Sequence, residues 1–267
     1  MELLGLFGQD IEGSLSPALH GAALRATGRE GVYMLWPMAP DDLAAGMRAA
    51  HLLGARGANV TAPYKQAAAQ SVMRLDPWAR RIGAVNVLVR EPGGWVGHNT
   101  DADGFWQPLA ALGRPLRRAL VLGTGGAALA VLAVLGREGI ALTVAGRNRE
   151  ALGRIGREFG ALAVDWRQRH AHTDVDLIVN ATSFGTEAGL SPLEEAALPS
   201  GAIVYDLIYR PLPTELLQRA HRRGCRTIGG GGMLLAQAML AWRLWFNEDP
   251  PHRAMATALE RGLAEVR

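Results

Sequence analysis

The sequence predicts an α/β protein of two domains, and two observations carry this prediction. Apolar segments typical of strands alternate with segments typical of amphipathic helices along most of the 267 residues, which favours a mainly parallel sheet. The alternation runs to about residue 104 and begins again near Arg118. With 49% hydrophobic and 20% charged residues, the chain is expected to bury a core and not to be disordered.

The first block is expected to hold three strands, each followed by a helix, and then a hairpin. Ser16 and Pro17 open the first helix, and Asp41 or Asp42 is expected to cap the second. In chain order we expect strands at 2–8, 32–38 and 59–61, helices at 16–28, at 40–54, from about 63 and at 76–83, a hairpin over 84–100 that turns at 92–94, and a helix at 103–113.

The second block continues the alternation, and its last part is expected to be helical. Strands are predicted at 118–123, 140–146, 161–164, 174–183 and 202–209, helices at 126–138, at 149–159 and from 231 onward, and a strand entering a loop around Cys225. The uncharged segment 119–136 reaches the minimum length of a membrane span. Gly123, Gly125 and Gly126 near its start favour a strand, a tight turn and a helix of a soluble protein instead.

A glycine-rich turn follows the first strand of the second block. The segment GTGGAA, from Gly123 to Ala128, lies between an apolar strand and a helix, which is the context of the dinucleotide-binding fingerprint. Gly123 allows the tight turn, Gly125 lets backbone amides approach a pyrophosphate, and the helix N-terminus attracts its negative charge. A plain structural turn stays as the alternative, because one glycine motif alone is a weak signal.

The residues after the next strand favour NADP over NAD. NAD-binding folds carry an acidic residue near this position for the ribose 2′-hydroxyl, whereas this chain has Arg147, Asn148 and Arg149. The planar guanidinium of arginine pairs with a 2′-phosphate, which a carboxylate would repel. We therefore expect NADP as the cofactor, with arginines on a solvated loop as the alternative interpretation.

Composition and the remaining motifs argue against several other function classes. The net charge of +3 is small and the basic pairs are scattered, which fits an anionic small molecule better than nucleic acid. Cys225 is the only cysteine, so no intramolecular disulfide forms and a cytoplasmic protein is expected. The first residues, MELLGLFGQD, include no basic region, so no signal peptide is predicted. No metal is expected, because His170 and His172 lack a third ligand at a suitable spacing.

A lysine and an aspartate in the first block are candidates for proton transfer. If Pro63 begins a helix, Lys65 lies in its first turn, where the helix dipole disfavours the ammonium form and suits the amine to proton exchange near neutrality. Asp101 follows a strand-like segment and would hold such a lysine in place. Alternatively, Lys65 is a solvated charge, and Asp101 or Asp103 caps the next helix. Spacing alone does not decide between these interpretations.

Eight segments of the chain stand in an order that is informative as a set. They are SLSPALH (14–20), NVTAPYK (59–65), IGAVN (82–86), GHNTDADGF (97–105), VLGTGGAALA (121–130), NATSFG (180–185), DLIYRPLPT (206–214) and GMLLAQA (232–238). Over nearly its whole length the chain thereby resembles the shikimate dehydrogenase family. The resemblance implies a substrate domain at 1–104 to which C-terminal helices at 231–267 return, and a Rossmann NADP-binding domain at 105–230. It implies reversible, NADPH-dependent reduction of 3-dehydroshikimate to shikimate in aromatic amino acid biosynthesis, without a metal.

The resemblance also implies roles for individual residues. Lys65 passes a proton to the substrate carbonyl as hydride arrives from the nicotinamide, and Asp101 orients the lysine. Hydroxyl and amide groups suit a polyhydroxylated acid, because analogues would leave buried groups unpaired. The implied substrate residues are Ser14, Ser16 and Tyr209 for the carboxylate, and Thr61, Asn86 and Gln237 for ring hydroxyls. The implied cofactor residues are Gly123, Thr124, Gly125, Gly126, Ala127, Arg147, Asn148, Arg149, Thr182, Leu207 and Gly230.

Singly, several of these residues have other interpretations. The two serines would cap the helix that follows, Asn86 would fill a turn, and Gln237 would be a polar spot on an amphipathic helix. The chain departs from the family pattern at Gly13, Gly21 and Val87. These departures keep a quinate or aminoshikimate dehydrogenase as an alternative function.

A catalytically silent NADP-binding sensor is a further alternative, against which the retention of both Lys65 and Asp101 argues. The expected partner is a small-molecule substrate, with neither nucleic acid nor membrane, and the protein is expected to be a monomer or homodimer.

Overall fold

The chain folds into two compact units in a computed structural model that describes residues 1–265. The first unit comprises Met1–Gly104 and the segment from Leu235 on, and the second comprises Phe105–Leu234. The predicted division after residue 104 coincides with the first boundary, and the predicted division after residue 230 lies shortly before the second one. Residues 266–267 of the predicted C-terminal segment lie outside the described residues.

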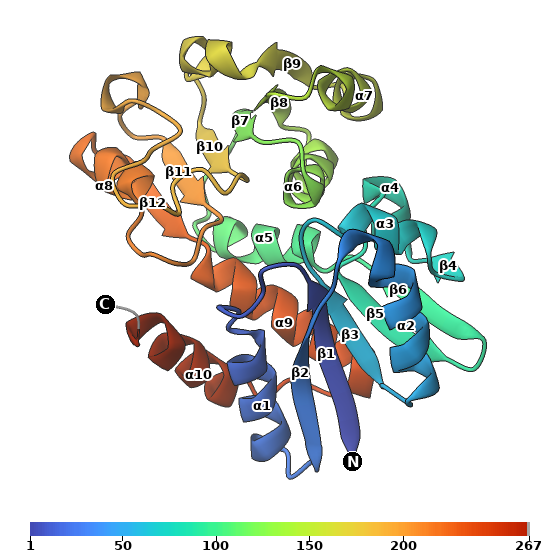
Figure 1. The fold of residues 1–267 in the computed structure, drawn as a ribbon. Helices are drawn as coiled ribbons and strands as arrows, with labels where there is room; N and C mark the ends of the chain where they lie inside the picture. Colours follow the sequence, from blue (N-terminus) through green and yellow to red (C-terminus); the bar gives the residue numbers. More distant parts are fainter. Residues whose placement is uncertain (266–267) are drawn as a thin grey trace. The chain divides into compact units, whose positions relative to one another are not determined.

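A six-stranded mixed sheet forms the centre of the first unit (Figure 1), with the strand order β2-β1-β3-β5-β6-β4. The predicted strands and hairpin are confirmed, and β4 is an addition of two residues at the sheet edge. β1 (Glu2–Gly8) lies parallel to and between β2 (Gly31–Pro37) and β3 (Gly57–Val60), β5 (Val87–Glu91) is antiparallel to β3 and to β6 (Gly94–His98), and β4 (Arg74–Leu75) is parallel to β6.

Helices cover both faces of this sheet, because successive side chains of β1 point to opposite faces. Phe7 packs in an apolar cluster with Met47 of α2, whereas Leu4 and Leu6 pack in another with Trp245 of α9. The last helix, α10, packs against α1, which confirms the expected return of the C-terminal helices to the first unit. The helices are α1 (Ser16–Ala26), α2 (Leu43–Leu52), α3 (Lys65–Gln70), α4 (Pro77–Ile82), α5 (Asp101–Ala110), α9 (Gly231–Phe246) and α10 (His252–Ala264), of which α5 and α9 each contain a boundary between the units.

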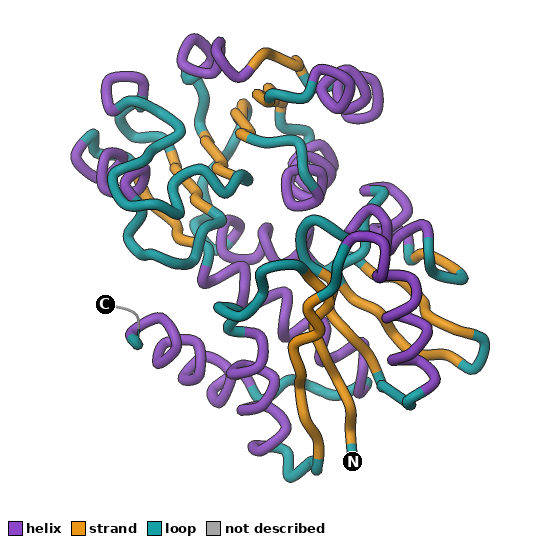
Figure 2. The backbone as a smooth tube through the Cα atoms, in the orientation of Figure 1, coloured by secondary structure: helices purple, strands orange, loops and turns teal. Residues whose placement is uncertain are grey.

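The second unit contains a six-stranded sheet, whose strands are orange in Figure 2. All neighbouring strands in it are parallel. Its order, β12-β11-β10-β7-β8-β9, is that of a Rossmann fold, in which the chain begins at the centre and extends first to one side and then to the other. The predicted Rossmann domain is thus confirmed. Its elements are β7 (Arg118–Leu122), α6 (Gly126–Arg137), β8 (Ala141–Gly146), α7 (Arg149–Phe159), β9 (Leu162–Asp165), β10 (Leu177–Asn180), β11 (Ile203–Asp206), α8 (Glu215–Arg222) and β12 (Arg226–Gly229).

The uncharged segment 119–136 divides into β7, a turn and α6, as predicted. Eight consecutive residues of α6, Ala128–Leu135, are buried, so this helix is apolar all round because it lies in a protein core. Among residues 1–265, no helix combines the length and the hydropathy that a membrane crossing requires. Cys225 is buried just before β12, as expected, and burial raises the pKa of its thiol.

Two helices differ from the predictions. Neither acid caps the second helix: Asp42 occupies the N-cap position of α2 but makes no capping bond, because a 3-10 turn over Pro40–Asp42 leads directly into the helix. Helix α8 is not among the predicted elements, although its start is readable in the sequence, since the Thr214 side chain accepts from the Leu217 N–H at 3.3 Å.

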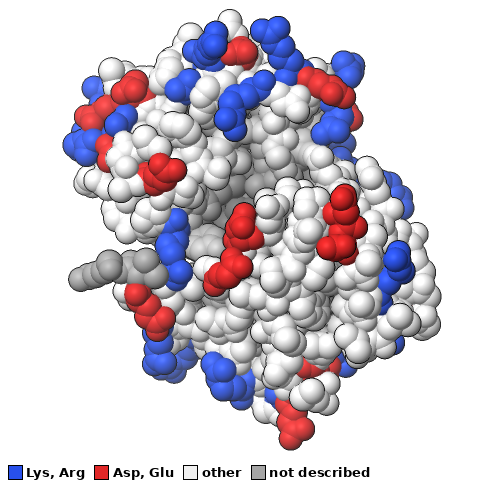
Figure 3. Space-filling model, viewed as in Figure 1, with Lys and Arg blue, Asp and Glu red and all other residues white. Residues whose placement is uncertain are grey.

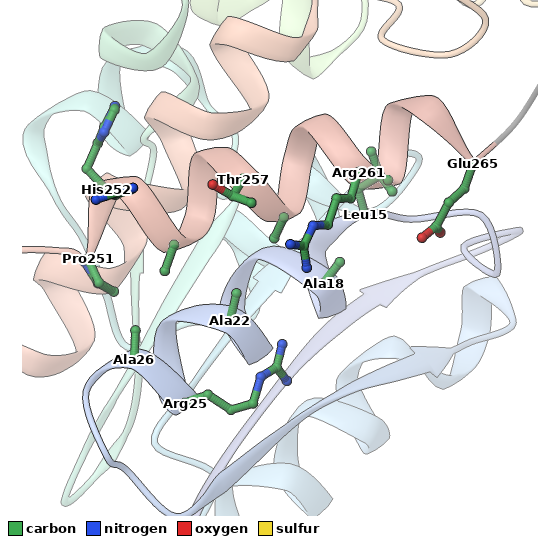
Figure 4. A pocket seen from close by; sticks show the side chains of 14 residues that line it. Leu15, Ala18, Ala22, Arg25, Ala26, Pro251, His252, Thr257, Arg261 and Glu265 are labelled. Carbon is green, nitrogen blue, oxygen red and sulfur yellow. The ribbon is translucent and has the colours of Figure 1, made fainter.

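Charged side chains of both signs and a groove mark the surface. On the face in Figure 3, basic and acidic side chains are interspersed, without a continuous basic area. No three His, Cys, Asp or Glu side chains among residues 1–265 gather into a metal-binding group. A groove of about 950 Å³ lies between α1 and α10, and its lining includes Ala18, Ala22, Arg25 and Arg261 but none of the predicted site residues (Figure 4).

Candidate active site

The first unit brings the two candidate catalytic residues into direct contact. Lys65 is the first residue of α3 and Asp101 is the first residue of α5, and Lys65 Nζ lies 2.6 Å from Asp101 Oδ2. The lysine side chain is 15% exposed and the aspartate side chain 5% exposed, so this ion pair is largely withdrawn from water. A solvated lysine and a capping aspartate, the two alternatives left open by spacing, do not describe this arrangement.

Asn86 holds the Asp101 carboxylate in position. The buried Asn86 side chain donates from Nδ2 to Asp101 Oδ1 at 2.8 Å and to Thr100 Oγ1 at 3.0 Å. Its Oδ1 accepts from the Thr100 N–H at 2.8 Å, and Asn99 Oδ1 accepts from the Asp101 N–H at 3.0 Å. Both donor hydrogens of Asn86 are therefore used inside the protein, and their effect is to orient the aspartate.

Gln237 and Thr61 lie close to this cluster in the first unit. Thr100 Oγ1 donates to the Gln237 carbonyl at 3.2 Å, and a Cβ atom on Gly104 would lie 2.8 Å from Gln237 Cβ, so α5 and α9 are in close contact there. Thr61 begins the turn that carries the chain from β3 to Lys65. Its half-buried hydroxyl has no hydrogen-bond partner within the described part of the chain, which leaves it available to a ligand.

The two candidate serines lie at the start of α1. Ser14 Oγ accepts from the Ser16 N–H at 3.2 Å, and Ser16 is buried. Tyr33 Oη donates to Asn59 Oδ1 at 2.7 Å, and Asn59 Nδ2 donates to the Asn86 carbonyl at 3.2 Å. Buried hydrogen bonds thus run from Tyr33 to the residue that orients the aspartate.

In the second unit, the glycine-rich turn joins β7 to α6 where the strand order reverses. Open α/β sheets bind ligands beside the carboxyl ends of strands at such a point, here β7 and β10. Gly123 has a φ of +116°, and a Cβ atom on it would lie 3.0 Å from the Ala181 carbonyl oxygen, so glycine is required there. Gly125, the N-cap of α6, has an extended backbone, and a Cβ atom on it would meet no atom within 4 Å. There is therefore open space beside Gly125 at the N-terminus of α6.

The three candidates for the 2′-phosphate follow β8 and are exposed. Asn148 Oδ1 accepts from the Ala151 N–H at 3.0 Å and caps α7, so this oxygen serves the fold. Arg147 and Arg149 form no hydrogen bond or ion pair with any residue of the described range 1–265. Their two guanidinium groups are available to an anion.

The remaining candidates lie on loops of the second unit. Thr182 Oγ1 donates to Asn180 Oδ1 at 2.7 Å and accepts from the Phe184 N–H at 3.1 Å, so its hydroxyl is used within its own loop. A Cβ atom on Gly230 would lie 2.1 Å from the Leu207 carbonyl oxygen, which places these two candidates in contact. Tyr209 also belongs to the second unit, whereas the other five candidate substrate residues belong to the first. Burial raises the pKa of the Tyr209 phenol.

Known proteins similar to this chain identify its family. The model of the shikimate dehydrogenase substrate binding domain matches residues 6–88, and that of the shikimate 5′-dehydrogenase C-terminal domain matches residues 230–260. A protein of Paramagnetospirillum magneticum named shikimate dehydrogenase (NADP(+)) is 42% identical over 259 residues, which are 93% of this chain and 94% of that protein. The chain belongs to the shikimate dehydrogenase family.

Solved structures of shikimate dehydrogenases share its fold. The enzyme of Thermus thermophilus, determined in complex with NADP(H) and shikimate, is 37% identical with a TM-score of 0.90, over 98% of this chain and 100% of that one. A quinate dehydrogenase of Corynebacterium glutamicum, determined in complex with NAD, is 32% identical with a TM-score of 0.87, over 97% and 99% of the two chains. The shared fold therefore does not by itself choose between shikimate and quinate.

In this shikimate dehydrogenase family member, one signal for Lys65 can be read from the sequence alone. Lysine and arginine together number 28, and Lys65 is the only lysine. A guanidinium keeps its charge throughout the physiological pH range, whereas an ammonium can give up a proton. The chain thus uses arginine at all other strongly basic positions and lysine at the one that pairs with Asp101. Thr100 and Asn99, which support this pair, carry no comparable signal.

Proposed function

We propose that this protein is an NADP-dependent shikimate dehydrogenase that reversibly reduces 3-dehydroshikimate to shikimate, a step of aromatic amino acid biosynthesis. The observation that carries the proposal is the largely buried pair of Lys65 Nζ and Asp101 Oδ2, 2.6 Å apart, in a member of this family. Reduction of a ketone to an alcohol needs a proton donor beside the hydride source. A silent NADP-binding sensor would have no use for such a pair.

In the direction of reduction, Lys65 donates the proton and Asp101 positions it. The ammonium has three hydrogens, of which one is directed at Asp101, so the others can reach a substrate oxygen. The proton passes to the carbonyl oxygen, which becomes the hydroxyl of shikimate, and the amine is left neutral. In the reverse direction the amine takes this proton back. When bound, NADPH supplies the hydride that the carbonyl carbon receives.

We assign the coenzyme to the second unit, residues 105–230 in the predicted division, because its residues suit NADP. The open space before α6 at Gly125 suits a pyrophosphate, which the helix N-terminus attracts. Arg147 and Arg149, without protein partners in the described chain, suit the 2′-phosphate. Thr124, Gly126 and Ala127 complete the proposed turn.

We assign the substrate to the first unit, residues 1–104 with the C-terminal helices. Thr61 has an unused hydroxyl, which supports its proposed contact to a ring hydroxyl, and Gln237 is proposed for the same ring. Asn86 spends both donor hydrogens on Thr100 and Asp101, so its proposed contribution is first to orient the aspartate. Ser14, Ser16 and Tyr209 remain the proposed carboxylate ligands. We further propose a cytoplasmic monomer or homodimer, with its single unpaired cysteine in support of the location.

Assays of the purified protein with two substrates and two coenzymes test the proposal. We expect shikimate with NADP⁺ to yield NADPH absorbance, and quinate or NAD⁺ to support much lower rates. Comparable rates with quinate would replace the narrow assignment by the broader one that Gly13, Gly21 and Val87 keep open. Binding of NADPH without turnover of either acid would favour the silent sensor.

Replacing Arg147 by alanine should raise the KM for NADP⁺ by roughly 10-fold or more and leave the KM for NAD⁺ within about 2-fold, because a charge-assisted bond to the 2′-phosphate is lost. Steady-state kinetics with both coenzymes measure the two changes. Arg154→Ala is a matched control, since Arg154 is an exposed arginine within α7 and its loss changes the net charge equally. Equal effects on both coenzymes would remove the 2′-phosphate assignment.

A further inference from the structure

Asp206 is a carboxylate in the interior of the second unit that none of the assigned roles uses. It ends β11 and has no exposed surface, and among residues 1–265 it is hydrogen-bonded only to neutral groups. Its Oδ1 accepts from Asn180 Nδ2 at 3.0 Å and from the Ile208 N–H at 3.1 Å, and its Oδ2 accepts from Thr214 Oγ1 at 2.7 Å. Burial raises the pKa of Asp206 to about 6. An interior carboxylate without a cation is costly, and asparagine would fill the same space, so the position has a reason to be acidic.

The carboxylate dictates which way the Asn180 side chain faces. An ionised carboxylate only accepts hydrogen bonds, so the amide nitrogen of Asn180 faces Asp206 and the amide oxygen faces away. That oxygen accepts from Thr182 Oγ1 at 2.7 Å and from the Thr182 N–H at 3.2 Å, while Nδ2 also donates to the Phe184 carbonyl at 3.1 Å. The loop that follows β10 is therefore tied to one amide whose orientation Asp206 sets.

This loop forms one side of the glycine-rich turn. A Cβ atom on Gly123 would lie 3.0 Å from both the Ala181 carbonyl oxygen and Thr182 Cγ2, so the loop and the turn are already as close as glycine permits. Asp206 also ties down the loop that follows β11, through Ile208 and Thr214. One carboxylate thus joins two loops at the carboxyl edge of the sheet, the edge at which Rossmann folds bind dinucleotides.

We propose that Asp206 is a positioning residue of the coenzyme site, whose carboxylate fixes the Asn180 amide and thereby holds Ala181 and Thr182 against the glycine-rich turn. The inference rests on the proposed function, in that NADP is taken to bind at this turn. It assigns Thr182 an indirect role, since its hydroxyl is spent on Asn180 and Phe184 and its methyl group faces Gly123.

Asp206→Asn tests the inference, because it keeps the shape and gives the side chain a donor that faces Asn180 Nδ2 or Thr214. We expect the dissociation constant of NADPH, measured by calorimetry, to rise by about 10-fold. The dissociation constant of shikimate should rise much less, by no more than about 3-fold, since only Tyr209 of the groups assigned to it lies on a loop that Asp206 holds and the other five lie in the first unit. A change confined to the coenzyme separates positioning from a general loss of structure.

Asp176→Asn is the matched control in the same unit. Asp176 lies just before β10, at the opposite end of the strand, and its Oδ2 accepts from the N–H groups of Arg117 and Arg118 at 2.7 and 2.9 Å. This variant also disturbs hydrogen bonds to a carboxylate, but at the end of β10 that lies away from the glycine-rich turn. Its dissociation constant for NADPH should therefore equal that of the unaltered protein.

Thr182→Val keeps the inference testable even where Asp206→Asn fails to fold. It removes only the hydroxyl at the outer end of the chain of bonds and should weaken NADPH binding by a similar factor, whereas Thr182→Ser should restore it. In the double variant the two losses should not add, because both act through Asn180. NADPH binding unchanged in Asp206→Asn or in Thr182→Val, or an equal loss of shikimate binding, would overturn the inference. An unaltered protein that does not bind NADPH would overturn the proposed function and the inference together.

Discussion

Replacing Lys65 by alanine should lower kcat for shikimate oxidation by roughly 10²–10⁴-fold, the usual contribution of a positioned acid or base. The dissociation constant of shikimate should change little, because the proposed substrate ligands are other residues. Asn86 would still donate to the Asp101 carboxylate, and Asn99 would still accept from the Asp101 N–H, so the variant loses the proton donor and keeps its support. Steady-state kinetics with saturating NADP⁺ and calorimetry with shikimate measure the two quantities.

Lys65→Arg is the sharper control for this prediction. Arginine keeps the positive charge and can pair with Asp101, but its guanidinium does not give up a proton. The variant should therefore be nearly as inactive as Lys65→Ala. A rate within a few-fold of the unaltered protein in either variant would show that Lys65 is not the proton donor.

The Lys65 amine can be observed by itself, because the chain has one lysine. Lysine labelled at Nζ gives one side-chain signal in this protein, since Lys65 is the only lysine of the chain. That signal should shift when shikimate is added and stay in place with an acid that does not bind. If saturating shikimate does not shift the signal, the substrate does not bind beside Lys65.

Replacing Gly125 by aspartate should abolish coenzyme binding while leaving the fold as stable as before or more so. The backbone of Gly125 is extended and a Cβ atom there meets no other atom, so a side chain is accommodated. Aspartate is a preferred N-cap and interacts well with the helix dipole, which should stabilise the protein by a few tenths to about 1 kcal/mol. The same carboxylate would occupy and repel the place of the pyrophosphate, so we expect the dissociation constant of NADPH to rise roughly 100-fold or more.

The two effects of Gly125→Asp are measured separately, by thermal unfolding and by calorimetry with NADPH. Gly125→Ala is the control for a side chain without charge, and it should weaken binding much less. Gly123 is unsuited to this test, because its φ of +116° would strain any other residue. NADPH binding retained by Gly125→Asp would move the pyrophosphate away from α6.

The arrangement of strands and helices was predictable because it follows from short-range patterns. Short apolar runs identified β1 and β7, and the glycines after β7 identified the turn into α6. The two-residue strand β4 was beyond such patterns, since so short a strand has no periodicity of its own. Thr214, a preferred N-cap residue, marks the start of α8 in the sequence. Helix α8 was therefore predictable, although it is not among the predicted elements.

The hydrogen-bond partners of the polar residues were not predictable in the same way. Lys65 and Asp101 are 36 residues apart, and the sequence equally allowed Asp101 to cap a helix. The Asn86 amide was expected to bind substrate or fill a turn, whereas its donors are spent on Thr100 and Asp101. Asn148 was expected to bind the coenzyme together with two arginines, whereas its side-chain oxygen caps α7.

By itself, the sequence determined that this chain is an α/β protein with a Rossmann half, a glycine-rich turn at Gly123 and Gly125 that suits a coenzyme, and a single lysine at the start of a helix. Only the tertiary structure decided that Lys65 meets Asp101, that Asn86 serves the aspartate, and that Asp206 joins two loops beside the turn. The reason is physical: helix and strand preferences act between near neighbours along the chain, whereas a buried polar group takes whichever partner the strand register and helix packing bring within about 3 Å.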